Sequence, residues 1–86
     1  MNIVTEAQIK HMIENGVLVD VTFNPIRNKK DKYFCAVRVN KHDSILHTQK
    51  GRMRKFTAKA AINWSHEVKI GNKIVFDAEH NSSLII

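Results

Sequence analysis

VLVDVTF at residues 17–23 and YFCAVRV at residues 33–39 are the two stretches that decide the fold. In both, apolar side chains occupy every second position, which is the period of a β-strand with one face buried. Pro25 ends the first strand, and residues 24–31 are polar enough to form the turn between the two. The sequence therefore predicts a β-hairpin with a polar loop.

Shorter stretches extend this hairpin into a sheet. Residues 45–48 and 52–56 predict a second pair of strands, and residues 73–78 predict a further strand. The connections are too short for crossovers, so we expect the sheet to be antiparallel. The apolar residues 84–86 are expected to complete a strand and to be buried within the sheet or across a homodimer.

A first helix is predicted over residues 5–15. Thr5 and Gln8 match the capping box, in which each side chain accepts the backbone N–H of the other residue. Gly16 favours the left-handed conformation in which helices end. One face of this helix is apolar and carries Ile9, Met12 and Ile13.

A second helix is predicted over residues 58–67, with Thr57 as its N-cap. One arc of its helical wheel is expected to pack on the sheet, with Trp64 in the core; it gathers Ala58, Ala60, Ala61, Ile62, Trp64, Ser65 and Val68. The fold class is therefore α+β. A small antiparallel sheet of three to five strands packs against an N-terminal helix and a second helix near residues 58–67, in a single domain of residues 1–86.

The composition is that of an ordinary globular domain. Of the 86 residues, 43% are hydrophobic and 26% are charged, which is too apolar for a disordered tail. The single cysteine, Cys35, excludes an intramolecular disulfide and fits a reducing compartment. The sequence lacks a signal-peptide pattern and an apolar run of roughly 18 residues that could span a membrane. We therefore expect a soluble, cytoplasmic protein with no membrane partner.

The residue patterns of common active sites are missing from the sequence. Cys35 falls on the inward side of its strand, so we expect a buried structural thiol and not a nucleophile. The five histidines show neither the i, i+4 helical spacing nor the short Cys/His spacing of metal sites. Paired carboxylates and a Gly-rich phosphate loop are not evident either. We expect no catalytic residue, metal, cofactor or small-molecule substrate.

Positive charge is concentrated in the middle of the chain. Residues 27–59 hold eleven of the fourteen Lys and Arg against only Asp31 and Asp43, a net charge of +9. The remaining residues carry three cations and six acids, a net charge of −3. Segregated charge creates a directed potential that attracts polyanions, so it points to nucleic acid as the partner.

Nine side chains of this region are the candidate nucleic-acid contacts: Arg27, Lys29, Lys30, Lys32, Arg38, Lys50, Arg52, Arg54 and Lys55. The first four belong to the predicted hairpin loop, where they would contact phosphates without specifying sequence. Strand alternation places Arg52 and Arg54 on the face opposite Met53. If Met53 faces the core, both arginines face outward with Arg38 as a candidate neighbour, and each can bind a phosphate or a guanine edge.

Plainer interpretations of the same features stay open. An edge strand can carry its cations only to prevent aggregation, and a lysine-rich turn can simply be solvated. Tyr33 and Phe34 point to opposite faces of their strand, so one of them must face outward. There it could stack on an unpaired base, or it could cover the stems of neighbouring lysines.

The order of hairpin, third strand and helix resembles the arm-type DNA-binding domain of tyrosine recombinases. The resemblance covers about residues 20–66 and lies in YFCAVRV (33–39) and RKFTAKAAINW (54–64). These stretches share a basic-aromatic strand end, a Thr cap, and an alanine and a Trp on the helix. The N-terminal helix and the C-terminal strands depart from that family.

The resemblance implies that the sheet enters the major groove of duplex DNA. It also implies that Arg38, Arg52 and Arg54 contact bases or phosphates. A looser similarity is to small accessory proteins of plasmid stability and partition operons, some of which carry an Arg-x-Phe strand before an Ala-rich helix.

The sequence thus predicts a small nucleic-acid-binding protein that is not an enzyme. The expected target is duplex DNA, bound through the basic sheet face and the hairpin loop, with a regulatory or maintenance role on a plasmid or other mobile element. One alternative is a protein-interaction or inhibitor module that docks on an acidic partner. Another is an RNA or single-strand binder. Salt-dependent binding separates the nucleic-acid classes from the protein module, and duplex against single-stranded probes separates the two nucleic-acid classes.

Overall fold

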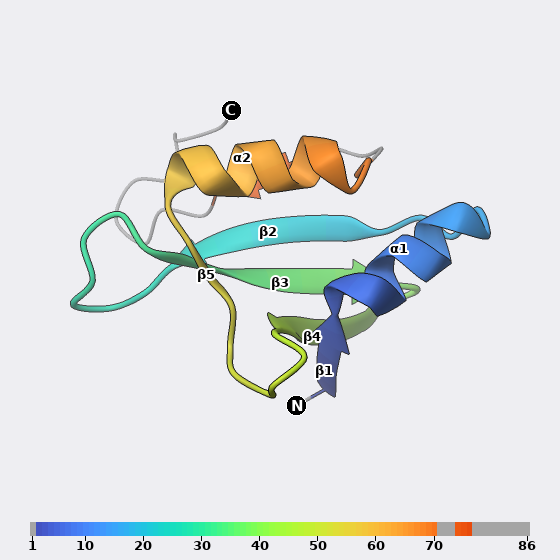
Figure 1. Cartoon of the computed structure of the whole chain (residues 1–86), viewed down its shortest axis with the longest axis horizontal. Helices are drawn as coiled ribbons and strands as arrows, with labels where there is room; N and C mark the ends of the chain where they lie inside the picture. The colour runs from blue at the N-terminus through green and yellow to red at the C-terminus, as the bar shows by residue number, and fades with distance from the viewer. Residues whose placement is uncertain (1, 71–73, 77–86) are drawn as a thin grey trace.

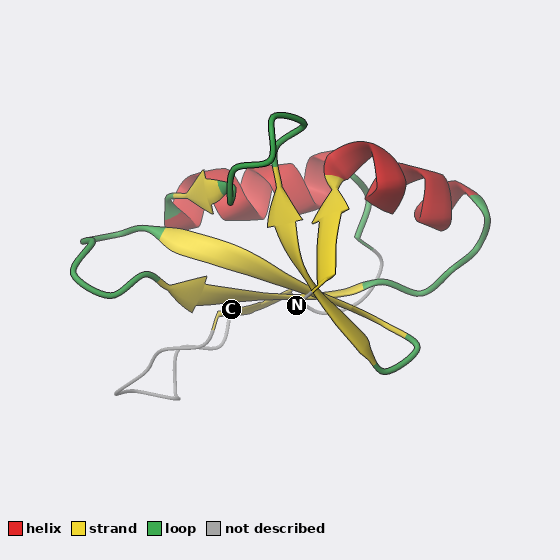
Figure 2. Cartoon of the chain, turned by 90° about the horizontal axis from the view of Figure 1, so that it is seen from below, coloured by secondary structure: helices red, strands yellow, loops and turns green. Residues whose placement is uncertain are grey.

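The computed structural model describes residues 2–70 and 74–76. Figure 1 shows α2 running alongside β2 and β3 and α1 following directly from β1, and Figure 2 shows both helices on one side of the strands. The α+β fold class is confirmed. The elements in chain order are β1 (Asn2–Thr5), α1 (Glu6–Glu14), β2 (Asp20–Pro25), β3 (Tyr33–Val39), β4 (His42–His47), β5 (Lys55–Phe56), α2 (Ala58–Glu67) and β6 (Ile74–Phe76).

Both helices begin where the sequence predicts. At α1, the Thr5 N–H donates to Gln8 Oε1 over 2.8 Å and the Gln8 N–H donates to Thr5 Oγ1 over 3.4 Å, which completes the capping box. Gly16 has a φ of +77° just after α1, the left-handed ending expected of it. At α2, Thr57 is the N-cap, and its hydroxyl accepts the Ala60 N–H over 3.2 Å. Local side-chain chemistry therefore places both helices.

The sheet has the strand order β1-β4-β3-β2-β6, with β5 also paired to β3. The predicted hairpin is confirmed, because β2 and β3 are antiparallel, although β2 begins at Asp20 and not at residue 17. The expectation of a purely antiparallel sheet is wrong at two pairings, since β1 is parallel to β4 and β2 is parallel to β6. Whole elements, including a helix each, lie between these partners and serve as crossovers. The described residues thus form a mixed sheet of six strands, one more than the largest number predicted.

Residues 45–48 and 52–56 pair less regularly than predicted. The returning chain makes one antiparallel bridge, between Met53 and His47, and then leaves β4 for β3. Residues 52–54 therefore do not form a regular strand, and strand alternation fails there. On reaching β3, β5 places Phe56 opposite Tyr33 and Lys55 opposite Phe34.

The core lies between the helices and the inner face of the sheet. Phe23 is fully buried at its centre, with ring centroids 5.5 Å from Phe56, 5.1 Å from Phe76 and 6.3 Å from Trp64. The prediction that Trp64 is a core residue is confirmed, since it is 4% exposed. Ala60 was expected inside and is exposed, because the buried stripe of α2 follows Ala61, Trp64, Ser65 and Val68.

Cys35 is fully buried on the inner face of β3, as predicted. Burial raises the pKa of its thiol to about 12, so the group stays protonated and unreactive at neutral pH. No helix within residues 2–70 and 74–76 is long and apolar enough to cross a membrane. The strand and the buried contact predicted for residues 84–86 lie outside the described residues, as do both ends of the strand predicted over residues 73–78.

Candidate nucleic-acid interface

The loop between β2 and β3, residues 26–32, is called the hairpin loop here. The Ile26 N–H donates to the Lys32 carbonyl over 2.8 Å and closes it. Asn28 and Asp31 adopt φ values of +66° and +52°, a left-handed conformation that Asn and Asp tolerate better than most residues. The tight turn that results exposes Arg27, Lys29, Lys30 and Lys32.

Asp31 ties the hairpin loop to the start of α2. Its Oδ1 accepts the N–H of Ala58 over 3.2 Å. The first N–H groups of a helix have no partner within the helix, and the positive end of its dipole favours a carboxylate. The one acid of the hairpin loop therefore serves as an anchor to the body of the protein, while the four cations of the loop are exposed.

The chain between β4 and β5, residues 48–54, is called the linking loop here. It turns at Gly51, which has a φ of +85° and donates its N–H to the Thr48 carbonyl over 2.9 Å. This turn leaves Lys50 and Arg52 exposed. Figure 1 shows β5 lying between the linking loop and the hairpin loop.

Lys55 connects these two basic loops. It is exposed on β5 and lies opposite Phe34 of β3, next to the Tyr33–Phe56 pair. Lys32 directly precedes β3 and lies two positions before Phe34, the residue opposite Lys55, so the two lysines lie near each other at this end of the sheet. We call the resulting group the basic edge; its seven exposed cations are Arg27, Lys29, Lys30, Lys32, Lys50, Arg52 and Lys55.

Arg54 does not face outward, so this part of the predicted interface is corrected. Its Nη1 donates to Glu6 Oε1 over 2.7 Å, and its guanidinium carbon lies 4.9 Å from the ring centroid of Phe56 and 5.9 Å from that of Trp64. The prediction relied on strand alternation, which residues 52–54 do not follow. Arg54 instead holds the linking loop against the two helices.

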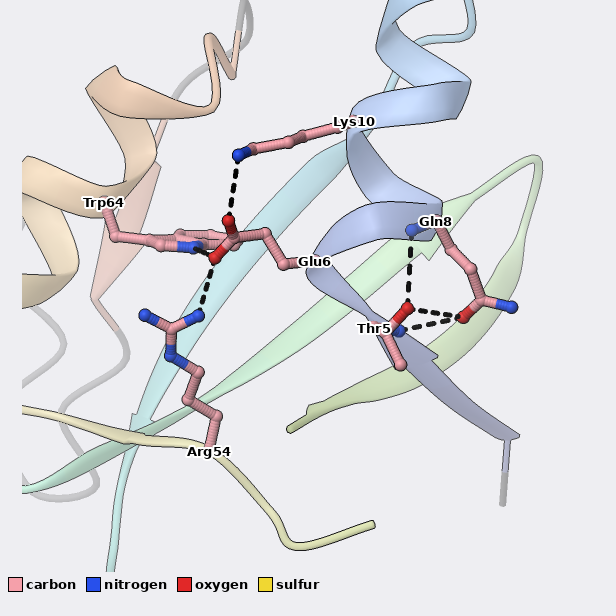
Figure 3. A network of polar contacts seen from close by, with 6 residues as sticks. All are labelled: Thr5, Glu6, Gln8, Lys10, Arg54 and Trp64. Carbon is pink, nitrogen blue, oxygen red and sulfur yellow. Dashed lines mark hydrogen bonds and ion pairs between the residues drawn. The ribbon is translucent and has the colours of Figure 1, made fainter. Parts of the chain in front are cut away.

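Glu6 is the centre of this polar network (Figure 3). Its Oε1 also accepts the indole N–H of Trp64 over 2.8 Å, and its Oε2 lies 3.0 Å from Lys10 Nζ. The hydrogen bond from Trp64, the ammonium of Lys10 and the guanidinium of Arg54 lower the pKa of Glu6 to about 2. We call these four residues the Glu6 hub, and it joins α1, the linking loop and α2.

Arg38 is exposed on the sheet, as predicted, but it is neutralised there. Its Nε donates to Asp43 Oδ1 over 2.9 Å and its Nη2 donates to Asp43 Oδ2 over 3.2 Å. The register places Asp20 of β2 on its other side. The hydrogen bonds from Arg38 lower the pKa of Asp43, so the carboxylate stays charged beside it. Arg38 is therefore separate from the basic edge in charge and in position.

The outer face of the sheet, away from the helices, carries a groove of about 550 Å³. Small side chains such as Thr22, Asn24 and Ala36 line it, and the charged side chains among its described lining residues are Asp20, Arg38 and Asp43. Two acids against one cation do not favour a phosphate. The face that the recombinase resemblance would insert into the major groove is thus not the positively charged one.

The two candidate stacking residues differ in position. Tyr33 points inward, and its ring meets Phe76 edge-on with centroids 5.2 Å apart. Phe34 lies on the outer face and is partly buried. Only Phe34 is therefore placed to contact a base, and only with part of its ring.

Comparisons with protein-family models, curated proteins and solved structures found no match for this chain. The resemblance to recombinase arm-type domains therefore stays a prediction. Within residues 2–70 and 74–76, no three His, Cys, Asp or Glu side chains are grouped so that they could hold a metal ion. The basic edge is the strongest candidate site that the geometry presents.

Proposed function

We propose that this protein binds nucleic acid along the basic edge and that duplex DNA is its target. The observation that carries the proposal is the placement of seven exposed cations on the hairpin loop, β5 and the linking loop. Asp31 is the one acid within these segments, and it is turned to the start of α2. A strip of cations of this kind attracts the phosphate backbone and releases its counterions.

Contact with the backbone, and not with base edges, is the mode that this arrangement supports. Most of the cations are lysines on loops, which act as point charges towards phosphates. The sheet face that would have to read bases has two acids beside Arg38. Binding is therefore expected to be tight at low salt and to discriminate little between sequences.

The aromatic residues favour a duplex over a single strand. Proteins that hold single strands without sequence preference stack the bases on exposed aromatic rings. Here Phe23, Phe56 and Trp64 are buried, Tyr33 packs on Phe76, and Phe34 is only partly exposed. A regulatory or maintenance role on a plasmid or other mobile element rests on the sequence resemblances alone, and the cytoplasmic location proposed for it rests on the single cysteine.

The test is a titration of duplex DNA, single-stranded DNA and hairpin RNA across a series of salt concentrations. The variant Lys30→Gln/Arg52→Gln removes one cation from each loop of the basic edge. Its control, Lys41→Gln/Lys69→Gln, removes two exposed cations elsewhere. Lys41 lies in the turn at the other end of β3, and Lys69 lies beyond the end of α2 that is remote from Asp31.

We expect the basic-edge variant to bind duplex DNA more weakly, with a slope of log K against log salt that is shallower by about 0.9 for each lost phosphate contact. The control keeps the parental slope. Equal losses in both variants would mean that only net charge matters and would remove the basic edge as a site. Absence of measurable binding to all three probes at low salt would favour the alternative, a module that docks on an acidic protein.

A further inference from the structure

β1 is an uncharged edge strand of the sheet. It is the outermost strand, and among the described residues its only strand partner is β4. Natural edge strands are commonly protected by a charged residue, a proline, a bulge or a very short length, and of these Asn2–Thr5 has only its length of four residues. Ile3 is 58% exposed on this strand. A short, uncharged edge with one exposed isoleucine can still pair with another strand.

The backbone of Ile3 faces the open side of β1. The Thr5 N–H donates to the Gln8 side chain and so does not point towards β4. Backbone groups alternate in direction along a strand, so the N–H and carbonyl of Ile3 point the same way as those of Thr5. Ile3 thus offers one donor and one acceptor on the edge that β4 does not use.

The surface beside β1 is also a part of this basic chain that a second copy can approach. A groove of about 540 Å³ lies between β1, α1 and the end of β3, and its lining includes Ile3, Val4, Met12 and Val39. Among the described residues that line it there is no Asp, Glu, Lys or Arg, and its titratable side chains are His11 and His42. In a chain of net charge +6, two copies repel each other most where their basic edges meet and least at a neutral patch.

We infer that β1 pairs antiparallel with β1 of a second copy, with the two Ile3 residues facing each other across a two-fold axis. Each Ile3 donates its N–H to the other and accepts in return, and Asn2 lies opposite Val4 of the second copy. The contact is self-complementary, as a two-fold interface must be. The Ile3 side chains then cover each other on the outer face, and the two sheets become one.

This dimer forms only at raised concentration. Four residues a side bury less than the roughly 1,200 Å² of a stable interface, so chains separate on dilution. The interface is also distinct from the basic edge. A protein that fails to bind DNA can still dimerise, and a monomer can still bind DNA, so this inference and the proposed function fail separately.

The first experiment is sedimentation equilibrium of the full chain from roughly 10 μM to 1 mM, where such weak pairing is measurable. We expect the parent to move from the 9.9 kDa monomer towards twice that mass. Ile3→Lys should stay monomeric over this range. Leu18→Lys, which changes the other large exposed apolar side chain of the described residues, should behave as the parent.

The second experiment does not require the fold to tolerate a lysine at position 3. On the two-fold axis the Ile3 Cα atoms are about 5.5 Å apart, within the range of a disulfide. Ile3→Cys should therefore give a covalent dimer on mild oxidation, whereas Leu18→Cys should give far less. The native Cys35 is buried and does not interfere. A parent that stays at 9.9 kDa throughout, or equal crosslinking of the two cysteine variants, would overturn the inference.

Discussion

At the residue scale, the carboxylate of Glu6 is bound by donors from three separate parts of the chain: α1, the linking loop and α2. Its carboxylate is 30% exposed, so its bonds to Arg54, Lys10 and Trp64 are partly screened but still charge-assisted. Removing the charge leaves two cations without their counter-charge and weakens the indole bond. The hub therefore links stability to pH.

We expect Glu6→Gln to lower the free energy of unfolding at pH 7 by roughly 1–2 kcal/mol, a value reduced for solvent screening. The pKa of Glu6 is about 2 in the fold against the ordinary 4.5, so its charge stabilises the fold above pH 4.5. That contribution is lost as the pH falls towards 2. The parent and the variant should therefore converge in stability in acid, as urea unfolding at pH 7, 4 and 2.5 would measure.

The control for this prediction is Glu14→Gln, which removes an exposed carboxylate from the last residue of the same helix. It should differ little from the parent at any of these pH values. A difference between the parent and Glu6→Gln that stays constant from pH 7 to pH 2.5 would show that the hub does not act through its charge.

The Glu6 hub could not be predicted from the sequence. Glu6 is 48 residues from Arg54 and 58 from Trp64, and nothing local to Glu6 indicates either contact. The outward prediction for Arg54 used a period of two in a stretch that has no regular period. The exposure of the loop cations could be predicted without knowing any distant contact, because polar turns lie at the surface.

At the scale of elements, local sequence signals predicted the helices and the hairpin correctly, whereas the long-range strand pairings could not be predicted. The β2–β3 hairpin and both helices follow from alternation, caps and turn residues, all of which act within a few positions. β1 has only four residues, too few to show a period, and its partner β4 lies beyond two further strands. The hydrogen bond between Asp31 and Ala58 also joins two elements, and no sequence motif predicts it.

We expect Asp31→Ala to loosen the hairpin loop at its anchor. A carboxylate at a helix N-terminus contributes about 0.3–1 kcal/mol, so the Ala58 amide should exchange with solvent about two- to fivefold faster. Asp31→Asn keeps an oxygen acceptor and should fall between the parent and Asp31→Ala. Amide hydrogen exchange measured by NMR provides the comparison. Identical exchange at Ala58 in all three proteins would mean that the bond does not hold the loop.

At the scale of the whole molecule, the cations and the aromatic rings are kept apart. The basic edge lies on loops and β5, whereas Phe23, Phe56, Trp64 and Phe76 form the buried centre. This separation is the reason for expecting backbone contacts without base stacking. It also makes the single tryptophan of the chain a reporter of the core and not of the binding surface.

Trp64 fluorescence should therefore stay constant when nucleic acid binds. The side chain is 4% exposed, so added iodide should quench it weakly, and saturating duplex or single-stranded DNA should change its intensity by less than about 10%. A fluorescence titration at low salt, with anisotropy of a labelled DNA to confirm binding, measures this. Strong quenching by a single strand would show that bases reach the core, and it would contradict the duplex assignment.

The Glu6 hub also bears on how quickly the chain can fold. Its contacts close loops of 48 and 58 residues, and the parallel β1–β4 pairing joins Asn2 to Ser44. Contacts so distant in sequence must overcome a large loop-closure entropy before they stabilise anything, which slows folding. α1 can form its capping box from residues 5–8 alone, yet the Glu6 hub is complete only when Trp64 has been synthesised. During synthesis the hub therefore closes only after almost all of the described chain has been made.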